Sequence, residues 1–99
     1  MQISRTHAVL FTKDRCKPCE ETKQFVYDLL ENNISLTETL SFLKKENHGA
    51  LVEAYELDKF PTLLITGPNG MEIGRVVGGA AIRDTIEERL IEIYRENNS

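Results

Sequence analysis

Residues 7–19 read HAVLFTKDRCKPC, a short apolar run followed closely by two cysteines three positions apart. The continuous apolar run predicts that HAVLFTK, residues 7–13, is a strand buried on both faces. From Lys17 onward apolar residues recur at helical spacing, so a helix is expected to begin between the cysteines. The pair Cys16 and Cys19 therefore lies where a buried strand gives way to a helix.

The start of a helix is a place where a cysteine becomes reactive. The first backbone N–H groups of a helix lack partners and, with the helix dipole, favour a negatively charged sulfur. Lys17 and Arg15 flank Cys16, and their positive charges also favour the thiolate, the form that attacks a disulfide. Pro18 suits the first turn, where its missing N–H is not needed. We expect Cys16 to be the exposed nucleophile and Cys19, one turn further in, to be the buried resolving thiol within disulfide reach.

Two other interpretations of the cysteine pair remain open. A zinc site needs four ligands, or three and a water, and the rest of the chain offers only His7, His48 and carboxylates at no recognisable ligand spacing. Free cysteines are also often small buried hydrophobes without chemistry. A CxxC beside a strand–helix–strand pattern favours redox chemistry over both alternatives, and we expect no metal.

The rest of the chain alternates between strand and helix patterns, without a repeat or a linker. Helical spacing predicts a first helix from Lys17 to the asparagines at 32–33 and a last helix from Gly78-Gly79 to about Glu96. Between them we expect strands over residues 34–40, 62–66 and 71–77, and a helix that is capped by Ser41, runs to about Leu57 and is kinked or split at residues 47–49.

Asn69-Gly70 lies between the last two predicted strands and is a strong hairpin signal. The resulting order of elements is βαβαββα. Its first half implies two parallel strands joined by a right-handed crossover, and its second half adds an antiparallel hairpin. We therefore expect one α/β domain over residues 1–99, with a four-stranded mixed sheet and helices on both faces.

Composition limits the functions open to this chain. Its 99 residues, 40% hydrophobic and 28% charged, describe one soluble globular domain. Apolar runs stay far below the roughly 18 residues of a membrane span, and the polar residues 1–7 lack a signal-peptide core, so we expect a cytoplasmic protein without a membrane partner. A net charge of −4 disfavours nucleic acid as a partner. Residues 1–19 nevertheless hold four basic residues against one acidic residue, so positive charge gathers around the cysteines.

Other charged residues invite weaker interpretations. Lys13, Arg15 and Lys17 are expected either to attract an acidic protein or the carboxylates of glutathione, or to form a solvated patch at a helix start. His7 and His48 have no motif partner, so we expect them at the surface or in caps rather than in catalysis. The acidic residues of the last helix are predicted to face solvent.

Four features of the chain together resemble the thioredoxin superfamily. They are the strand followed by CKPC, the segment Phe60-Pro61-Thr62-Leu63-Leu64, the Asn-Gly hairpin, and Val77-Gly78-Gly79 ahead of the last helix. The resemblance spans about His7 to Tyr94 and implies a thioredoxin-like fold. It also implies a dithiol–disulfide oxidoreductase, in which Cys16 and Cys19 are the catalytic pair of a motif completed by Lys17 and Pro18.

The resemblance implies roles for residues outside the motif. Pro61 would be the family's cis-proline, which faces the two sulfurs, and the backbone of Phe60 would pair with an extended substrate segment. Thr62 and Arg15 would lie beside that substrate segment. The pair Gly78-Gly79 would form a low wall where missing side chains admit the backbone of a partner.

The chain also departs from the thioredoxin pattern. Thioredoxins carry a further strand and helix before the first matched strand, whereas only six residues precede His7 here, so the expected architecture is the minimal glutaredoxin form. Leu10 stands where thioredoxins have a buried aspartate, and Arg15 where they have a tryptophan. Pro18 is third in the motif, as in thioredoxins, whereas glutaredoxins have Pro-Tyr inside it. This hybrid of glutaredoxin size and thioredoxin-like active-site segments is similar to small redoxins encoded by phages.

The leading hypothesis is an enzyme that reduces protein disulfides and donates electrons, for example to ribonucleotide reductase by family analogy. Its redox group is the Cys16–Cys19 disulfide, and no other cofactor is expected. A thioredoxin-reductase-type enzyme, a ferredoxin-linked reductase or glutathione would regenerate the dithiol. The alternatives are a glutathione-dependent glutaredoxin and a non-catalytic binding module with a thioredoxin fold. We expect the protein to be a monomer.

Overall fold

The computed structural model of the chain describes residues 5–99. Within them, strands and helices follow the predicted order βαβαββα, with two short 3₁₀ helices, η1 and η2, added. The first strand, the first and last helices and the hairpin form close to their predicted bounds, whereas residues 34–57 fold differently. The elements are β1 His7–Thr12, α1 Lys17–Glu31, η1 Ile34–Thr39, β2 Leu40–Lys44, η2 Lys45–Asn47, α2 Gly49–Ala54, β3 Thr62–Thr66, β4 Glu72–Val77 and α3 Gly79–Asn97.

The strands form one mixed sheet in the order β2-β1-β3-β4. β1 pairs in parallel with β2 and antiparallel with β3, and β3 forms an antiparallel hairpin with β4. The hairpin turn closes because the N–H of Gly67 donates to the carbonyl oxygen of Met71 at 2.8 Å, and the N–H of Gly70 donates to that of Gly67 at 2.9 Å. The predicted mixed sheet and the predicted hairpin are both confirmed.

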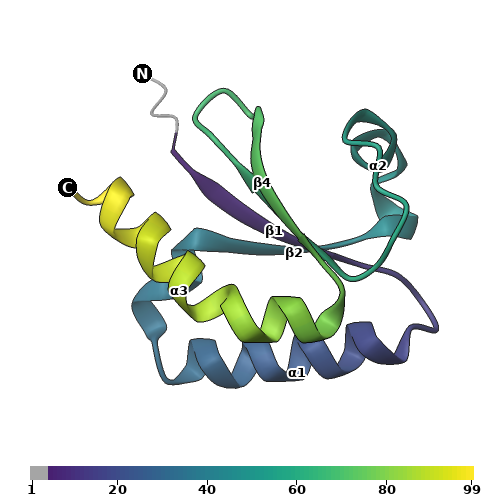
Figure 1. The fold of residues 1–99 in the computed structure, drawn as a ribbon, viewed down its shortest axis with the longest axis horizontal. Coiled ribbons are helices and arrows are strands. Elements are labelled where there is room, and N and C mark those ends of the chain that lie inside the picture. Colours follow the sequence, from purple (N-terminus) through teal and green to yellow (C-terminus); the bar gives the residue numbers. More distant parts are fainter. Residues whose placement is uncertain (1–4) are drawn as a thin grey trace.

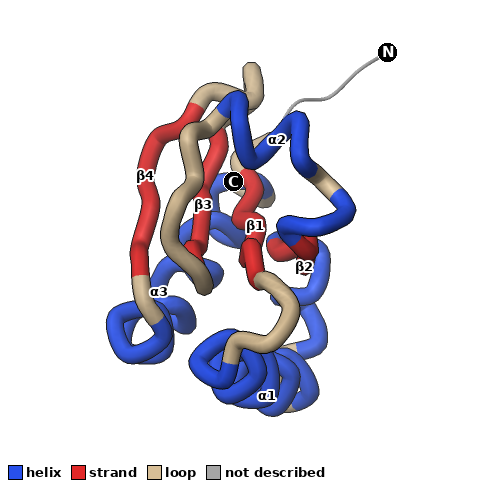
Figure 2. The backbone as a smooth tube through the Cα atoms, turned by 90° about the vertical axis from the view of Figure 1, so that its right-hand side faces the viewer, coloured by secondary structure: helices blue, strands red, loops and turns tan. Residues whose placement is uncertain are grey.

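Helices cover both faces of the sheet, as predicted (Figure 1). α1 and α3 lie side by side on one face, and Figure 2 shows α2 on the other. Successive side chains of a strand point to opposite faces, so Leu63 and Ile65 face α1 and α3 while Leu64 faces the α2 side. The core beneath α1 and α3 consists of Ala8, Leu10, Val26, Leu30, Leu36, Leu40, Leu63, Ile65, Ile82, Ile86, Leu90 and Ile93.

Residues 34–39 form η1 instead of the predicted strand. The alternation of Ile34 and Leu36 suggested one buried face, yet Ile34 is 70% exposed while Leu36 is buried. Two threonines bend this segment, because the hydroxyl of Thr37 donates to the carbonyl oxygen of Ile34 at 2.7 Å and that of Thr39 to Leu36 at 2.6 Å. Such local bonds favour tight turns over extended strands. The prediction of a strand over residues 34–40 is therefore wrong, and β2 begins only after η1.

Residues 41–57 do not form the predicted helix. Ser41, expected to be its cap, lies inside β2, where its hydroxyl pairs with Nε2 of His7 at 2.8 Å. The apolar side chains of β2 pack on both faces of the sheet. Phe42 packs against the α1–α3 core and Leu43 against the opposite cluster. This arrangement is typical of a strand between two layers. Only the short helix α2 remains of the longer helix that the spacing suggested.

The last helix, α3, is the longest element among the described residues. Its buried residues recur every three or four positions and lie on one side of the helix, which is the periodicity of an amphipathic helix; they include Ile82, Ile86, Leu90 and Ile93. Its glutamates are exposed, as predicted. Among residues 5–99, no helix combines the length and the apolar character that a crossing of the bilayer needs.

Candidate active site

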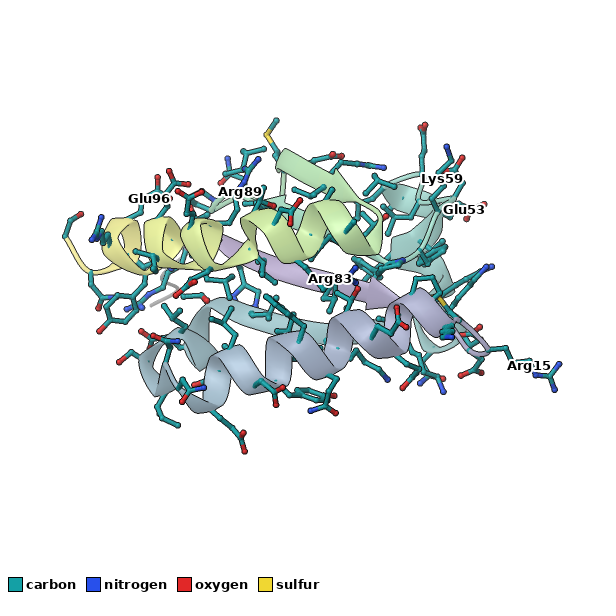
Figure 3. All side chains as sticks on the ribbon, turned by 60° about the horizontal axis from the view of Figure 1, so that its bottom comes forward. Arg15, Glu53, Lys59, Arg83, Arg89 and Glu96 are labelled. Carbon is teal, nitrogen blue, oxygen red and sulfur yellow. A yellow bond between two sulfur atoms is a disulfide. The ribbon has the colours of Figure 1, made fainter. Side chains whose placement is uncertain are left out.

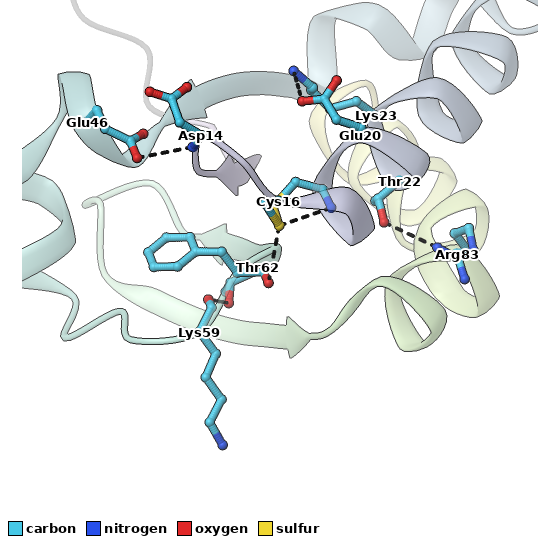
Figure 4. The surroundings of a disulfide bond; sticks show 11 residues. Asp14, Cys16, Glu20, Thr22, Lys23, Glu46, Lys59, Thr62 and Arg83 are labelled. Atoms are coloured by element: carbon cyan, nitrogen blue, oxygen red, sulfur yellow. Dashed lines mark hydrogen bonds and ion pairs between the residues drawn. A yellow bond between two sulfur atoms is a disulfide. The ribbon is translucent and has the colours of Figure 1, made fainter.

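The two cysteines lie at the N-terminal end of α1, where the sequence predicted them. Cys16 is the N-cap residue with an extended backbone, and Cys19 lies in the first turn. Their Cα atoms are 5.2 Å apart and their sulfurs form a disulfide. The N–H of Cys19 donates to Sγ of Cys16 at 3.2 Å, one of the dashed lines at Cys16 in Figure 4. Cys16 therefore occupies the position at which a helix stabilises negative charge.

The disulfide is more enclosed than expected. Cys19 is fully buried, as predicted, but Cys16 is only 7% exposed, so the prediction of an exposed nucleophile is wrong for this disulfide state. Sγ of Cys16 lies 3.9 Å from the carbonyl oxygen of Phe60, which belongs to the loop before β3. Access to the sulfur is therefore limited by the loop that carries Phe60.

The loop before β3 contains the cis peptide bond that the resemblance implied. The Phe60–Pro61 bond is cis, which confirms this prediction. The Thr62 hydroxyl donates to the carbonyl oxygen of Lys59 at 2.6 Å, and the N–H of Gly78 donates to that of Pro61 at 2.9 Å. Thr62 is almost fully buried, so its side chain holds this turn rather than facing a substrate.

The two glycines before α3 have different roles. Gly78 has a φ of +98°, which glycine adopts without steric cost, and a Cβ at this position would meet nothing within 4 Å. A Cβ on the buried Gly79 would lie 2.8 Å from Oγ1 of Thr22 and 3.0 Å from Nη1 of Arg83. The low wall expected over both glycines is therefore limited to Gly78, because the packing of α3 against α1 fills the space at Gly79.

Arg15 and Lys17 flank Cys16, and both residues are exposed. Arg15 has a φ of +56°, a left-handed conformation that is uncommon outside glycine, and this bend leads the chain from β1 into α1. Figure 3 shows the Arg15 side chain reaching outward at this end of the molecule. Pro18 lies in the first turn, as predicted. The three predicted cations, Lys13, Arg15 and Lys17, are therefore all exposed, and the last two flank the buried Cys16.

Three residues at and after the end of β2 also reach the site, and none of them was predicted from the sequence. Lys44 forms an ion pair with Asp14 at 2.9 Å, and this hydrogen-bonded carboxylate raises the pKa of Lys44. The carboxylate of Glu46 accepts the N–H of Asp14 at 3.1 Å. Nζ of Lys45 lies 5.5 Å from the ring centroid of Phe60, a cation–π contact. Parallel strands end at the same edge of a sheet, so the residues after β2 lie near those after β1. A correct prediction of β2 at residues 40–44 would have revealed these contacts.

No buried carboxylate accompanies the disulfide in the described part of the chain. Leu10, where the resemblance places the aspartate of thioredoxins, is fully buried in the apolar core. Every buried polar residue within residues 5–99 is a threonine. Deprotonation of Cys19 therefore has no buried acid–base partner here.

Neither histidine is placed for catalysis at the disulfide. His7 begins β1 at the end opposite the cysteines, and burial lowers its pKa. His48 precedes α2 in the N-cap position without a side-chain capping bond. Residues 5–99 contain no group of three or more His, Cys, Asp or Glu side chains arranged to hold a metal ion.

Similarity to known proteins is found in the structure of this chain and not in its sequence. No protein-family model and no curated protein sequence matches it. Thioredoxin of Fasciola hepatica is 20% identical, with a TM-score of 0.73 over 92% of this chain and 83% of that protein. A thioredoxin of Nicotiana alata is 19% identical, with a TM-score of 0.75 over 93% and 76%. Thioredoxin of Trypanosoma brucei brucei is 18% identical, with a TM-score of 0.72 over 96% and 80%.

The chain has the thioredoxin fold. This confirms the predicted fold class, a four-stranded mixed sheet with one parallel pair and covering helices. The CKPC disulfide lies at the start of α1 in this fold, and the cis Phe60–Pro61 bond lies across from it. At identities near 20%, the structural likeness establishes the fold alone.

Proposed function

We propose that this protein is a dithiol–disulfide oxidoreductase that reduces disulfide bonds in other proteins. The observation that carries the proposal is the Cys16–Cys19 disulfide at the first turn of α1, beside the cis Phe60–Pro61 bond. Such a short loop restricts the unfolded chain little, so a structural disulfide would contribute little stability at this spacing. The N–H of Cys19 that contacts Cys16 would stabilise a thiolate once the bond is reduced.

The proposed reaction exchanges disulfide bonds in two steps. The Cys16 thiolate attacks one sulfur of the substrate disulfide, so a mixed disulfide forms and the other substrate sulfur leaves as a thiolate. Cys19 then loses its proton and attacks Sγ of Cys16, which re-forms the protein disulfide and releases the first substrate sulfur as a thiolate. Two electrons pass to the substrate, and its two thiolates take up the Cys19 proton and one proton from solvent.

The backbone of Phe60 supports the proposed mode of substrate binding. Within residues 5–99, the N–H and C=O of Phe60 form no backbone hydrogen bond. An extended substrate segment can pair with such free groups as an added strand. Pairing there would hold a substrate sulfur near Cys16 and make its attack effectively intramolecular. The open space at Gly78 leaves room for that segment.

The dithiol must be regenerated by a separate reductant. We propose a thioredoxin-reductase-type enzyme, a ferredoxin-linked reductase or glutathione as the source of electrons. The protein would work as a monomer in the cytoplasm, where thiols are kept reduced. Disulfide-containing proteins, with ribonucleotide reductase as one example by family analogy, would receive the electrons.

Insulin reduction with dithiothreitol as electron source tests the proposal. Cys16→Ser should lower the rate to that of dithiothreitol alone, because the nucleophile is lost. Reduced Cys19→Ser, mixed with insulin in the absence of dithiothreitol, should instead accumulate a mixed disulfide with insulin, seen by mass spectrometry without reduction. The two variants lack the same disulfide, so each controls for the stability of the other. Wild-type turnover in both variants would refute the proposal, and biological effects that persist in the double variant would favour a non-catalytic binding module.

A glutathione-dependent activity is the second candidate. The observation that favours it is the exposure of Arg15 and Lys17 next to Cys16, because these cations can attract the carboxylates of glutathione. A glutathione mixed disulfide needs only the nucleophile for its turnover. Cys19→Ser should therefore retain activity on this substrate if the protein acts as a glutaredoxin, and should lose it if the protein acts as a thioredoxin.

A further inference from the structure

Four exposed cations lie on the segments next to the disulfide, and we name them the cationic rim: Arg15, Lys17, Lys45 and Lys59. The first two flank Cys16 in the chain. The other two flank it across the loop before β3, because Nζ of Lys45 lies 5.5 Å from the Phe60 ring centroid and Lys59 precedes Phe60. Figure 4 shows Lys59 extending from this loop into solvent. The rim therefore comes from three separate segments: residues 15–17, Lys45 in η2, and Lys59 in the loop before β3.

Two of the carboxylates near the rim pair with other cations. Asp14 pairs with Lys44 at 2.9 Å, and Glu20 pairs with Lys23 at 3.2 Å. A third, Glu46, accepts the backbone N–H of Asp14.

Two further carboxylates lie near the rim in sequence. The pKa of Arg75 is raised mainly by its hydrogen bond to Glu72. The negative charge of Asp58 raises this pKa further, so Asp58 interacts electrostatically with Arg75. Glu21 has no ion pair among residues 5–99. The members of the cationic rim also form no ion pair within those residues. Their charge therefore remains available to a partner.

The opposite end of the molecule is rich in exposed glutamates, whereas the disulfide end holds the rim together with carboxylates such as Glu53 (Figure 3). Exposed glutamates follow α3 toward its C-terminus, and Figure 3 places Glu96 and Arg15 at opposite ends. The whole chain has a net charge of −4, so the positive rim is a local feature against an acidic background. Such a charge distribution orients an approaching partner, and an acidic segment is drawn to the disulfide end.

We infer that the preferred substrate is a protein disulfide with acidic residues close to the attacked cysteine, which the cationic rim draws toward Cys16. This inference rests on the proposed function and specifies its substrate class. The acidic side chains would meet Arg15, Lys45 and Lys59 while the substrate backbone lies along Phe60. The rim acts on encounter and binding, so its effect falls on kcat/KM through KM and is weakened by salt.

Three disulfide peptides that differ only at the residues flanking one cysteine test the inference. The flanks are Glu, Gln or Lys, and the reduced wild-type protein is the reagent. We expect kcat/KM for the Glu peptide to exceed that for the Gln peptide about tenfold at low ionic strength, with the Lys peptide slowest. At about 0.5 M salt the three values should converge, because the charges are screened. Equal rates at low salt, or a preference for the Lys peptide, would overturn the inference.

Substitutions then locate the effect. In Lys45→Gln/Lys59→Gln the Glu-to-Gln ratio of kcat/KM should fall to about one third of its wild-type value or less. The ratio cancels any change that loss of the Lys45–Phe60 contact makes to the rates for both peptides. Arg5→Gln/Arg95→Gln removes the same charge from two exposed cations away from the disulfide and is the matched control, with an unchanged ratio. An unchanged ratio in Lys45→Gln/Lys59→Gln would overturn the role of the rim. Failure to reduce any peptide would refute the proposed function itself, whereas equal reduction of all three peptides refutes only the substrate preference.

Discussion

The two faces of the sheet are packed very differently. The face beneath α1 and α3 holds twelve buried residues in one cluster, whereas the face beneath α2 holds three, Phe11, Leu57 and Leu64. Burial of apolar surface stabilises a fold by roughly 25 cal/mol per Å², so the α1–α3 face supplies most of the stability. α2 itself has six residues, none of which is buried. The α2 face is therefore the weaker layer.

The disulfide lies on the boundary between these two layers. Cys16 caps α1 and Cys19 lies in its first turn, on the well-packed side, whereas Phe60 packs against the smaller cluster and contacts Lys45. Local opening costs less free energy where few apolar contacts are buried. The difference in packing predicts that the loop carrying Phe60 opens before α1 does. This opening would admit a substrate to Cys16.

Ile86→Ala tests the strong layer and should have the largest effect on stability. Ile86 is fully buried in the α1–α3 core, so the lost contacts and the cavity should cost about 3–5 kcal/mol in the free energy of unfolding by urea. Ile34→Ala is the control, because Ile34 is 70% exposed and should cost less than about 0.5 kcal/mol. Similar values for both variants would contradict the packing contrast.

Leu57→Ala tests the weak layer. Leu57 is 6% exposed in the smaller cluster, so we expect a loss of about 2 kcal/mol, at the lower end for such a change. The variant should also react faster with small disulfides at Cys16 in the reduced protein, because Phe60 is less firmly held. Leu51→Ala, in the exposed part of α2, should change neither quantity. The contrast fails if Leu57→Ala costs as much as Ile86→Ala or leaves the reactivity of Cys16 unchanged.

Gly79→Ala tests the contact between α3 and α1 beside the disulfide. The new Cβ would lie 2.8 Å from Oγ1 of the buried Thr22 and 3.0 Å from Nη1 of Arg83, so overpacking should destabilise the protein by about 1–3 kcal/mol. Gly49→Ala on the weak side is the matched control, since its Cβ would meet nothing within 4 Å. It should be neutral or stabilise the protein by up to about 1 kcal/mol. Thermal unfolding of both variants measures these changes in stability. A Gly79→Ala variant as stable as the wild type would argue against the close contact between α3 and α1.

His7→Gln should have the smallest effect, confined to the pH dependence of stability. Burial lowers the pKa of His7, so the unfolded chain binds a proton more readily than the folded protein. Stability should therefore be greatest above the ordinary pKa of about 6.5 and decrease as the pH falls through that value toward the folded-state pKa. In His7→Gln this decrease should be smaller when urea unfolding is followed from pH 7.5 to 5.5. Parallel pH profiles for both proteins would contradict this assignment.

Local sequence patterns were sufficient to predict the elements that carry the cysteines. The apolar run of β1, the helical stripe of α1 and the Asn-Gly turn before β4 each have a distinct period or turn signal. Pro18 and the cysteine spacing placed the disulfide at a helix start, and the resemblance implied the cis bond at Pro61. These features depend on near neighbours in the chain, which the sequence displays directly.

The middle of the chain could not be predicted in the same way. Ile34 and Leu36 imitate the alternation of a strand, but threonine hydroxyls bond to local carbonyls and form η1. Leu43 fits a helical stripe, yet pairing of β2 with β1 makes it a strand residue. Pairing with a distant strand also brings Lys45 to Phe60. Contacts of this kind depend on tertiary pairing, which local patterns do not encode.

The pH dependence of alkylation at Cys16 tests the central claim most directly. The fully reduced protein is treated with iodoacetamide between pH 5 and 10, and each cysteine is followed by mass spectrometry. We predict that Cys16 reacts before Cys19, with a midpoint below the value of about 8.5 that an ordinary thiol shows. A midpoint at or above that value, or faster reaction of Cys19, would contradict the account.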